Sequence, residues 1–431
     1  MAGLNYVTFN QDHSLLAVAT TRGLRTYTTD PFELSNNCTD DDISLVEPLF
    51  STSLVAVITT PRLLRIVNTK RNSTICELTF HGMVIAVKMN RKRLVVVLEE
   101  VMFMYDISNM VLLHQQVTPL NAAGICALSP NSEHNYLALP HHQNVQSGSQ
   151  AQSQPAHVPK SGVSEAMSGD VLLYDLSKME EVAVIQAHQT PLSSIAISND
   201  GTLMATASEK GTVIRVFSIP SGKKLYQFRR GSMPARIYCM TFNATSTLLC
   251  VSSATETIHI FKLAPPSSTI SGQSSTTSPA SPPDSPQQPT WSSRQRRPSN
   301  PTTSEDTTEG SKFDPDASST SPIPRQPRNP GFMSFMRRTS QNVSTGLVTR
   351  AAGYLPTSVT EMWEPQRDFA WMKIPRGTNG LPVRSVVAMA NNFPHVMVAT
   401  NEGWYYVYTI DLERGGEGTL VKKFEYVKEA S

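Results

Sequence analysis

The sequence predicts an all-β fold, a seven-bladed β-propeller, and three observations lead to this prediction. Short runs rich in Val, Ile, Leu and aromatic residues alternate with turns of Asn, Asp, Ser, Gly and Pro. Almost nothing in residues 1–263 has an apolar pattern of helical period. The runs fall into groups of four that recur about every 40 residues, which is the repeat length of four-stranded propeller blades.

The first four groups follow the N-terminus in order. We expect them to form blades 1 to 4 over residues 4–35, 43–80, 84–118 and 125–188. Blade 3 contains Tyr105-Asp106, which is similar to the Trp-Asp ending of WD40 blades, and blade 4 contains Tyr174-Asp175 in the matching place. The same type of repeat therefore continues across an interruption within blade 4.

The last three groups complete the ring. Residues 193–228 are the clearest blade, because residues 198–201 read Ser-Asn-Asp-Gly, a hairpin turn. Blade 6 begins at Ile237, and we expect its outer strand only after a long insertion. The propeller is thus predicted from residues 1–263, which hold blades 1 to 5 and most of blade 6, and from residues 368–427, which hold the outer strand of blade 6 and blade 7.

Two insertions interrupt this pattern. Residues 141–168 are rich in Gln, Ser, Gly and His and are interpreted as a flexible loop in blade 4. Its histidines lack the fixed spacing of a metal site. Residues 264–331 are rich in Pro, Ser and Thr, a composition that buries too little apolar surface to fold, so we expect disorder there.

Residues 332–355 differ from the disordered insertion before them. Apolar residues recur at spacings of four and seven, with Arg337 and Arg338 off the apolar stripe, which predicts a basic amphipathic helix. Such a helix could pack on the propeller, but its positive charge and bulky apolar side chains favour a membrane surface. The expected membrane-inserting residues are Phe332, Phe335, Met336, Val343 and Leu347.

Composition narrows the classes of function. A formal net charge of +2 argues against a strongly basic nucleic-acid binder, so any anion site must be local. The five cysteines are scattered without a Cys-x-x-Cys pair, which indicates neither disulfides nor zinc and fits a reducing cytosol. No signal peptide or apolar run of membrane-spanning length is present, so any membrane contact is expected to be peripheral. No catalytic constellation is recognisable, and we expect neither enzyme activity nor a cofactor.

The candidate site centres on Phe228-Arg229-Arg230-Gly231. Adjacent side chains on extended backbone point to opposite sides, so the two arginines should serve separate anions. Each guanidinium can bind a phosphate through two parallel hydrogen bonds, and Gly231 could take a positive φ or let a ligand approach. An isolated Arg-Arg-Gly is typical of a solvated turn. Hydroxyl-rich turns at residues 206–212 and 252–257, with Arg215 and His259, favour phosphate recognition instead.

At these residues the chain resembles the PROPPINs, the phosphoinositide-binding β-propellers of autophagy, and is most similar to their fungal autophagy-related members. The resemblance rests on Phe228-Arg229-Arg230-Gly231 with residues 208–217 before it and 255–261 after it, and it covers nearly the whole chain. It implies one lipid headgroup pocket on each side of the arginine pair. The first would consist of Thr206, Ser208, Gly211, Thr212, Arg215 and Arg229; the second would consist of His188, Arg230, Gly231, Ser253, Thr257 and His259.

Histidine 188 has an alternative interpretation. In many WD40 blades a histidine at this place forms a hydrogen bond within the blade, so His188 could be structural. If His188 and His259 both contact the ligand, their protonation should strengthen binding as the pH falls.

The resemblance also implies ligands, partners and places. The expected lipids are PtdIns3P and PtdIns(3,5)P2, and the expected role is autophagosome formation. A turn at Pro61-Arg62 would bind a lipid-transfer protein, and a vacuolar lipid-kinase complex is a further expected partner. The protein would be cytoplasmic and peripheral on the phagophore assembly site, vacuole and endosome membranes. The alternative is a WD40 scaffold that binds acidic or phosphorylated peptides without lipid specificity.

Overall fold

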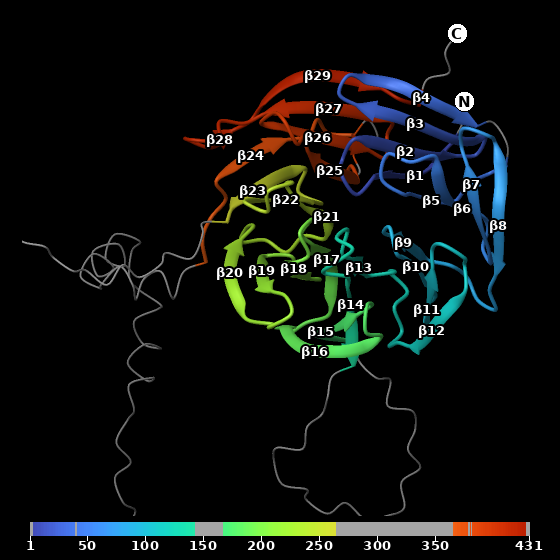
Figure 1. The fold of residues 1–431 in the computed structure, drawn as a ribbon. Helices are drawn as coiled ribbons and strands as arrows, with labels where there is room; N and C mark the ends of the chain where they lie inside the picture. The colour runs from blue at the N-terminus through green and yellow to red at the C-terminus, as the bar shows by residue number, and fades with distance from the viewer. Residues whose placement is uncertain are drawn as a thin grey trace, which may run out of the picture. The chain divides into compact units, whose positions relative to one another are not determined.

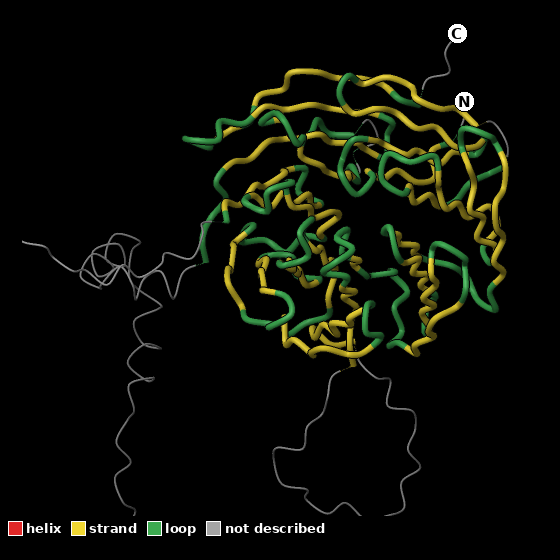
Figure 2. Tube along the Cα trace, in the orientation of Figure 1, coloured by secondary structure: helices red, strands yellow, loops and turns green. Residues whose placement is uncertain are grey.

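Seven β-sheets stand around a common axis in the computed structural model (Figure 1). The structure describes residues 3–38, 41–142, 167–263, 365–377, 380 and 382–427. In these residues the chain consists of strands, turns and loops (Figure 2). The predicted seven-bladed all-β propeller is confirmed. No helix in the described part of the chain is long and apolar enough to cross a bilayer.

Blades 1 to 3 each consist of four consecutive antiparallel strands. Blade 1 has β1 (Leu4–Phe9), β2 (Leu15–Thr20), β3 (Gly23–Thr29) and β4 (Phe32–Cys38). Blade 2 has β5 (Leu45–Pro48), β6 (Leu54–Thr60), β7 (Leu63–Asn68) and β8 (Ser73–Thr79). Blade 3 has β9 (Ala86–Met89), β10 (Arg93–Val97), β11 (Val101–Asp106) and β12 (Leu112–Val117).

Blades 4 to 7 complete the ring. Blade 4 has β13 (Ala127–Leu128), β14 (Tyr136–His142), β15 (Met167–Asp175) and β16 (Glu180–His188). Blade 5 has β17 (Leu192–Ile197), β18 (Leu203–Ser208), β19 (Val213–Ser218) and β20 (Lys224–Arg229). Blade 6 has β21 (Ile237–Phe242), β22 (Leu248–Ser253), β23 (Thr257–Lys262) and β24 (Ala370–Lys373); blade 7 has β25 (Ser385–Met389), β26 (His395–Thr400), β27 (Trp404–Thr409) and β29 (Thr419–Glu425).

The burial of each strand follows from its place in the blade. The second strand of a blade is covered on both faces by neighbouring blades, so β10 reads as a continuous apolar run and is almost wholly buried. The outermost strand β12 alternates between exposed and half-buried residues. The apolar core therefore lies between the blades, and it also closes the ring: Tyr405 of blade 7 donates a hydrogen bond to the carbonyl oxygen of Thr29 in blade 1, at 3.0 Å.

One feature of blade 6 was not predicted. A short strand, β28 (Gly416–Glu417), leaves the loop between β27 and β29 and pairs in parallel with β24, which gives this sheet a fifth strand. Gly415 allows the close approach, because it has φ +69° and a Cβ atom there would lie 2.1 Å from the carbonyl oxygen of Phe369. The outer edge of blade 6 is thereby covered by blade 7.

Three predicted segments of the chain cannot be compared in full with the structure. The blade 4 loop, predicted over 141–168, is described only at its two ends, up to His142 and from Met167. The predicted disordered insertion, 264–331, and the predicted membrane helix, 332–355, lie outside the described residues.

Candidate functional site

The arginine pair lies at the end of β20, the outermost strand of blade 5. Phe228 is buried and its ring stacks on that of Phe261 in blade 6, with ring centroids 4.7 Å apart. Because side chains alternate along a strand, Gln227 and Arg229 face the opposite side from Phe228. Arg229 is exposed, whereas Arg230 retains only 5% of its accessible surface. One arginine of the pair is thus exposed and the other is buried.

Arg230 is a buried cation with neutral partners. Its Nε donates to the carbonyl oxygen of Gly211 at 2.7 Å, its Nη2 to that of Met233 at 2.6 Å, and its Nη1 to the Thr255 hydroxyl at 3.4 Å. Burial lowers its pKa. Across the described residues no carboxylate forms an ion pair with Arg230, so its charge is not neutralised by an internal acid.

Arg215 has a similar environment on the other side of blade 5. Its Nη1 donates to the carbonyl oxygen of Ala187 at 2.6 Å, and its Nε donates to the amide oxygen of Gln227 at 3.1 Å. Burial lowers the pKa of this guanidinium as well. Arg215 borders a polar hollow between blades 4 and 5, together with Asp170, Gln186, His188, Gln189 and Lys224.

His188 belongs to the Arg215 group. The Nη1 of Arg215 lies 3.3 Å from Nδ1 of His188, and a guanidinium can only donate, so Nδ1 is an acceptor. The ring proton is then on Nε2, which donates to the Thr206 hydroxyl at 3.0 Å. Burial and the charge of Arg215 lower the pKa of His188 to about 4. The sequence grouped His188 with the second pocket, but the structure places it with Arg215 and Thr206 of the first.

Of the remaining residues of the first predicted pocket, two are buried in β18 and two lie in the turn that follows it. Thr206 and Ser208 are buried at the end of β18. Gly211 has φ +58°, and a Cβ atom there would lie 1.9 Å from the carbonyl oxygen of Ala235, so packing requires glycine. Thr212 accepts a hydrogen bond from the backbone N of Arg230 at 2.9 Å. The turn at residues 211–212 thus holds the second arginine through its carbonyl groups.

Hydroxyl groups surround Arg230 on the blade 6 side. The Ser253 and Thr255 hydroxyls lie 2.9 Å apart, and the Thr257 hydroxyl donates to the carbonyl oxygen of Thr255 at 3.4 Å. Thr255 contacts Arg230 directly, although sequence reasoning did not select it. The sequence did contain a signal for Thr255, because it lies between Ser253 and Thr257, which were both selected as hydroxyl donors. Gly231 does not have the expected positive φ, but a Cβ atom there would meet nothing within 4 Å, so this side of the turn is open.

His259 of the second predicted pocket is paired with an acid. Its Nδ1 lies 2.8 Å from Oδ2 of Asp368. Asp368 is 109 residues further along the chain, beyond the insertion, and nothing in the local sequence pointed to it. The arrangement as a whole provides arginines, hydroxyls and two histidines, which is suited to binding an anion.

Comparison with known proteins shows the family of this chain. A family model described as PROPPIN matches residues 3–151 and 157–280. The chain belongs to the PROPPIN family. Among curated relatives, Autophagy-related protein 18 of Phaeosphaeria nodorum is 52% identical, with 98% of this chain and 100% of the relative covered. The protein of the same name from Emericella nidulans is 50% identical over 99% of this chain and 97% of the relative. The chain is therefore an autophagy-related member of a phosphoinositide-binding family.

Solved structures have the same fold. KlAtg21, solved in complex with the coiled coil of AgAtg16, has a TM-score of 0.61 and 27% identity, covering 99% of this chain and all of that one. Hsv2 of Kluyveromyces lactis has a TM-score of 0.64 at 15% identity, covering 99% of both chains. The first of these shows that a related propeller binds a protein partner.

The strap, defined here as residues 365–369, links blades 5 and 6 of this PROPPIN. Gln366 pairs with β20 in parallel: its carbonyl oxygen accepts from the backbone N of Arg229 at 2.8 Å, and its backbone N donates to Gln227 at 3.1 Å. Phe369 then donates to the carbonyl oxygen of Ile260 at 2.7 Å, and the chain continues as β24. The chain that returns from the insertion thus lies directly beside the arginine strand, between β20 and β24 (Figure 1).

The Pro61-Arg62 turn of this PROPPIN connects β6 and β7. Both side chains are exposed, while the two carbonyl oxygens accept hydrogen bonds from Val84 at 2.8 Å and Phe80 at 2.9 Å. The turn is therefore anchored to the connection between blades 2 and 3. Its side chains remain free to contact a partner.

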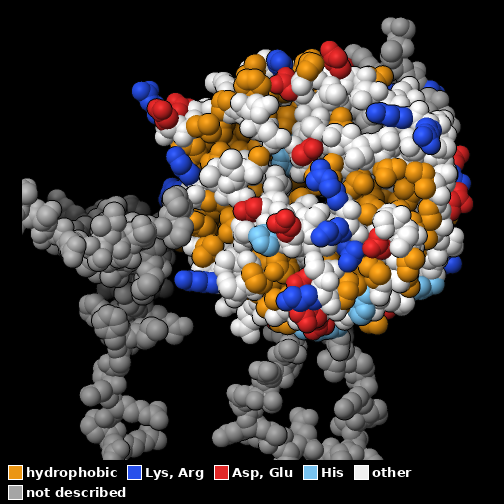
Figure 3. Space-filling model, in the orientation of Figure 1, with side chains coloured by type: hydrophobic (Ala, Val, Ile, Leu, Met, Phe, Trp, Pro, Cys, Tyr) orange, Lys and Arg blue, Asp and Glu red, His pale blue; other side chains and the backbone are white. Residues whose placement is uncertain are grey.

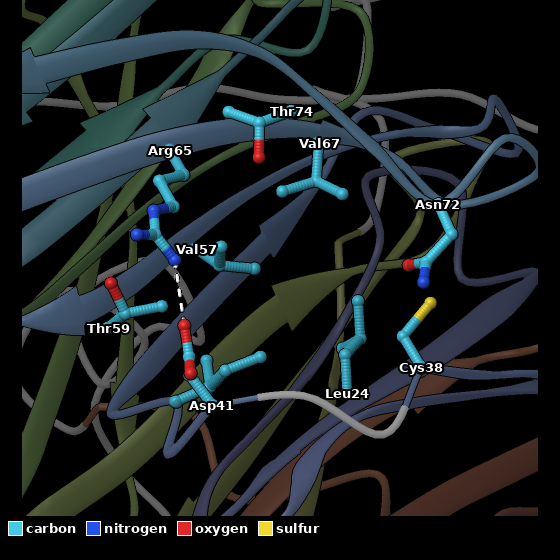
Figure 4. A pocket seen from close by; sticks show the side chains of 10 residues that line it. Leu24, Cys38, Asp41, Val57, Thr59, Arg65, Val67, Asn72 and Thr74 are labelled. Carbon is cyan, nitrogen blue, oxygen red and sulfur yellow. Dashed lines mark hydrogen bonds and ion pairs between the residues drawn. The ribbon is translucent and has the colours of Figure 1, made fainter.

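A second arginine position lies between blades 1 and 2. Arg65 borders a pocket lined in part by Val57 and Val67, and its guanidinium points toward Asp41, with Nη1 2.8 Å from the carboxylate (Figure 4). Its Nε also contacts Glu77 at 2.9 Å. On the face in Figure 3, Lys and Arg side chains are scattered among acidic ones. The described part of this face therefore presents no broad basic surface.

Proposed function

We propose that this PROPPIN binds 3-phosphorylated inositol lipids, PtdIns3P and PtdIns(3,5)P2, on the rim of blades 5 and 6. One headgroup is bound near Arg215 and Arg229, and another near Arg230 and His259. The observation that carries this proposal is that Arg215 and Arg230 are both desolvated and both held by neutral partners. Such cations retain their attraction for a phosphate, and the nearby hydroxyls supply further donors.

Two pockets on one rigid body account for useful membrane affinity. Each basic side chain near an anionic membrane surface contributes only about 1 kcal/mol to the binding free energy. Charge alone therefore does not select one phosphoinositide over another. When the first headgroup is bound, the second binds at a high effective concentration, and the two affinities reinforce each other. Selectivity for the 3-phosphate then comes from the fixed positions of the arginines and hydroxyls.

The test is vesicle sedimentation across a panel of phosphoinositides, comparing wild type with Arg229→Thr/Arg230→Thr. We expect the double variant to lose binding to PtdIns3P and PtdIns(3,5)P2 vesicles while its circular dichroism and melting temperature show a folded propeller. Arg65→Thr is the matched control, because that arginine is already neutralised by acids. Retained sedimentation of the double variant would contradict the proposal. Binding to phosphorylated peptides but not to vesicles would favour the scaffold alternative.

Membrane insertion by residues 332–355 is the second part of the proposal. Phe332, Met336 and Leu347 would enter the interface, with the arginines facing the headgroups. We expect the circular dichroism of the full chain to gain helical signal on adding PtdIns3P vesicles, and this gain to be absent when 332–355 is replaced by a Gly/Ser segment of equal length. No gain for the wild-type chain would count against insertion.

The cellular part of the proposal is autophagosome formation. At the phagophore assembly site the exposed Pro61-Arg62 turn would recruit a lipid-transfer protein, and a further role at vacuole and endosome membranes would involve a lipid-kinase complex. The names of the relatives and the protein complex of a related propeller support such a role. Pull-down of the lipid-transfer protein by wild type but not by Pro61→Ala/Arg62→Ala is the expected result, with vesicle binding unchanged.

A further inference from the structure

The ion pair between His259 and Asp368 joins two parts of the chain that the insertion separates. His259 is the third residue of β23, and Asp368 lies on the strap. The two side chains retain 13% and 24% of their accessible surface, and Nδ1 lies 2.8 Å from Oδ2. The contact is therefore short and largely shielded, yet it lies at the edge where the second headgroup is proposed to bind.

We propose that Asp368 is a positioning residue of the second pocket, which acts by holding the His259 ring so that Nε2 is directed to the bound phosphate. This inference rests on the proposed function. A carboxylate can only accept, so the ring proton of His259 is on Nδ1 and Nε2 is left for the ligand. In the imidazolium form of the ring, Nδ1 donates to Asp368 and Nε2 donates to the phosphate at the same time.

The surroundings of the ring keep this orientation. The His259 ring is stacked near that of Phe261, with centroids 6.3 Å apart, and its cross-strand neighbour on β24 is Trp371. The same relation, in which an acid orients a histidine by its second nitrogen, fixes histidines that bind metals. Several charged side chains lie on the elements packed here. They are Lys224 and Arg229 on β20, Arg230 directly after it, Glu256 before β23, Lys262 at its end, Arg367 and Asp368 on the strap, Lys373 on β24 and Glu417 on β28.

The strap gives Asp368 its place. Gln366 pairs with β20 through two backbone hydrogen bonds, of 2.8 and 3.1 Å, and Phe369 is bonded to β23 through Ile260. Asp368 is held between these two anchors. One short segment therefore contacts both the backbone of Arg229 and the ring of His259. The chain that follows the insertion thus lies beside both proposed pockets.

The test is a double-mutant cycle of Asp368→Asn and His259→Gln, measured by binding to vesicles that contain PtdIns3P. We expect each single variant to lose about tenfold in affinity, the effect of one charge-assisted hydrogen bond, and the double variant to lose no more than either single one. Glu256→Gln is the matched control: this acid precedes the same strand but pairs with Arg376, so binding should not change.

The outcomes separate the two proposals. Wild-type protein that binds none of the vesicles would overturn the proposed function and this inference with it. Wild-type protein that binds, with Asp368→Asn equal to it or with additive losses, would overturn the inference alone. A second measurement does not depend on whether the Asp368 variant folds. Histidine ¹⁵N NMR of the free wild-type chain shows which ring nitrogen of His259 carries the proton, and the spectrum of His259→Gln identifies the signal. We expect a proton on Nδ1, and a neutral ring with its proton on Nε2 would also overturn the inference.

Discussion

Blades 2 and 5 place an arginine at the same position and surround it differently. Arg65 is the third residue of β7, and Arg215 is the third residue of β19. In the neighbouring strands Arg65 lies between Val57 and Glu77, whereas Arg215 lies between Thr206 and Gln227. The outer-strand partner is thus a carboxylate in blade 2 and a neutral amide in blade 5.

This difference decides what each arginine can bind. Arg65 contacts Glu77 and Asp41, so its charge is more than balanced and an anion would meet net negative charge there. Arg215 is held by an amide, a carbonyl group and a neutral histidine, which orient the guanidinium without cancelling its charge. The propeller fold repeats the position of the cation, and the outer strand determines whether that cation faces an acid or a neutral amide.

The largest expected difference between the two blades is in vesicle affinity, when each arginine is replaced in turn. We expect Arg215→Gln to lower affinity for PtdIns3P vesicles about tenfold, because one charge-assisted contact to the phosphate is lost. Arg65→Gln should leave vesicle binding unchanged, although it removes an arginine from the same place in its blade. Titration of both variants against one vesicle preparation checks this. Equal losses would show that the partners of the two arginines do not matter.

Exchanging the outer-strand partner has a smaller expected effect. Gln227→Glu would give Arg215 the kind of partner that Arg65 has, at the present Nε to Oε1 distance of 3.1 Å. We expect about a fivefold loss of vesicle affinity, since the guanidinium then pairs with an internal acid. The melting temperature should not fall, because a new ion pair replaces a hydrogen bond. Glu77→Gln in blade 2 is the reciprocal control, and unchanged binding by Gln227→Glu would contradict the comparison.

The sequence predicted what depends on local pattern. Alternation at Phe228 and Arg229 predicted that the arginines diverge, and recurring four-strand groups predicted every blade. The grouping of His188 could not be predicted, because it depends on how β16 of blade 4 packs against Arg215 in blade 5. The strap and Asp368 depend on pairing across an insertion of about a hundred residues, where separation in sequence contains no information about register. Strand β28 likewise depends on contact between two blades.

The smallest expected effect concerns His188, the blade 4 histidine that contacts Arg215 of blade 5. The sequence predicted that protonation of both His188 and His259 strengthens binding as the pH falls. Burial beside Arg215 lowers the pKa of His188 to about 4, so almost none of it gains a proton between pH 7.5 and 6. Its neutral state stabilises the fold above the ordinary histidine range, and this contribution is lost as the pH falls toward 4.

We therefore expect His188→Gln to have the same pH profile of vesicle binding as wild type between pH 7.5 and 6, even if its affinity is lower throughout. A glutamine can still accept from Arg215 and donate to Thr206, so it retains both contacts of the neutral ring. The measurement is sedimentation at several pH values with vesicles of constant composition. A wild-type gain on acidification that His188→Gln abolishes would show that His188 does become charged, and that the arginine of blade 5 does not keep it neutral.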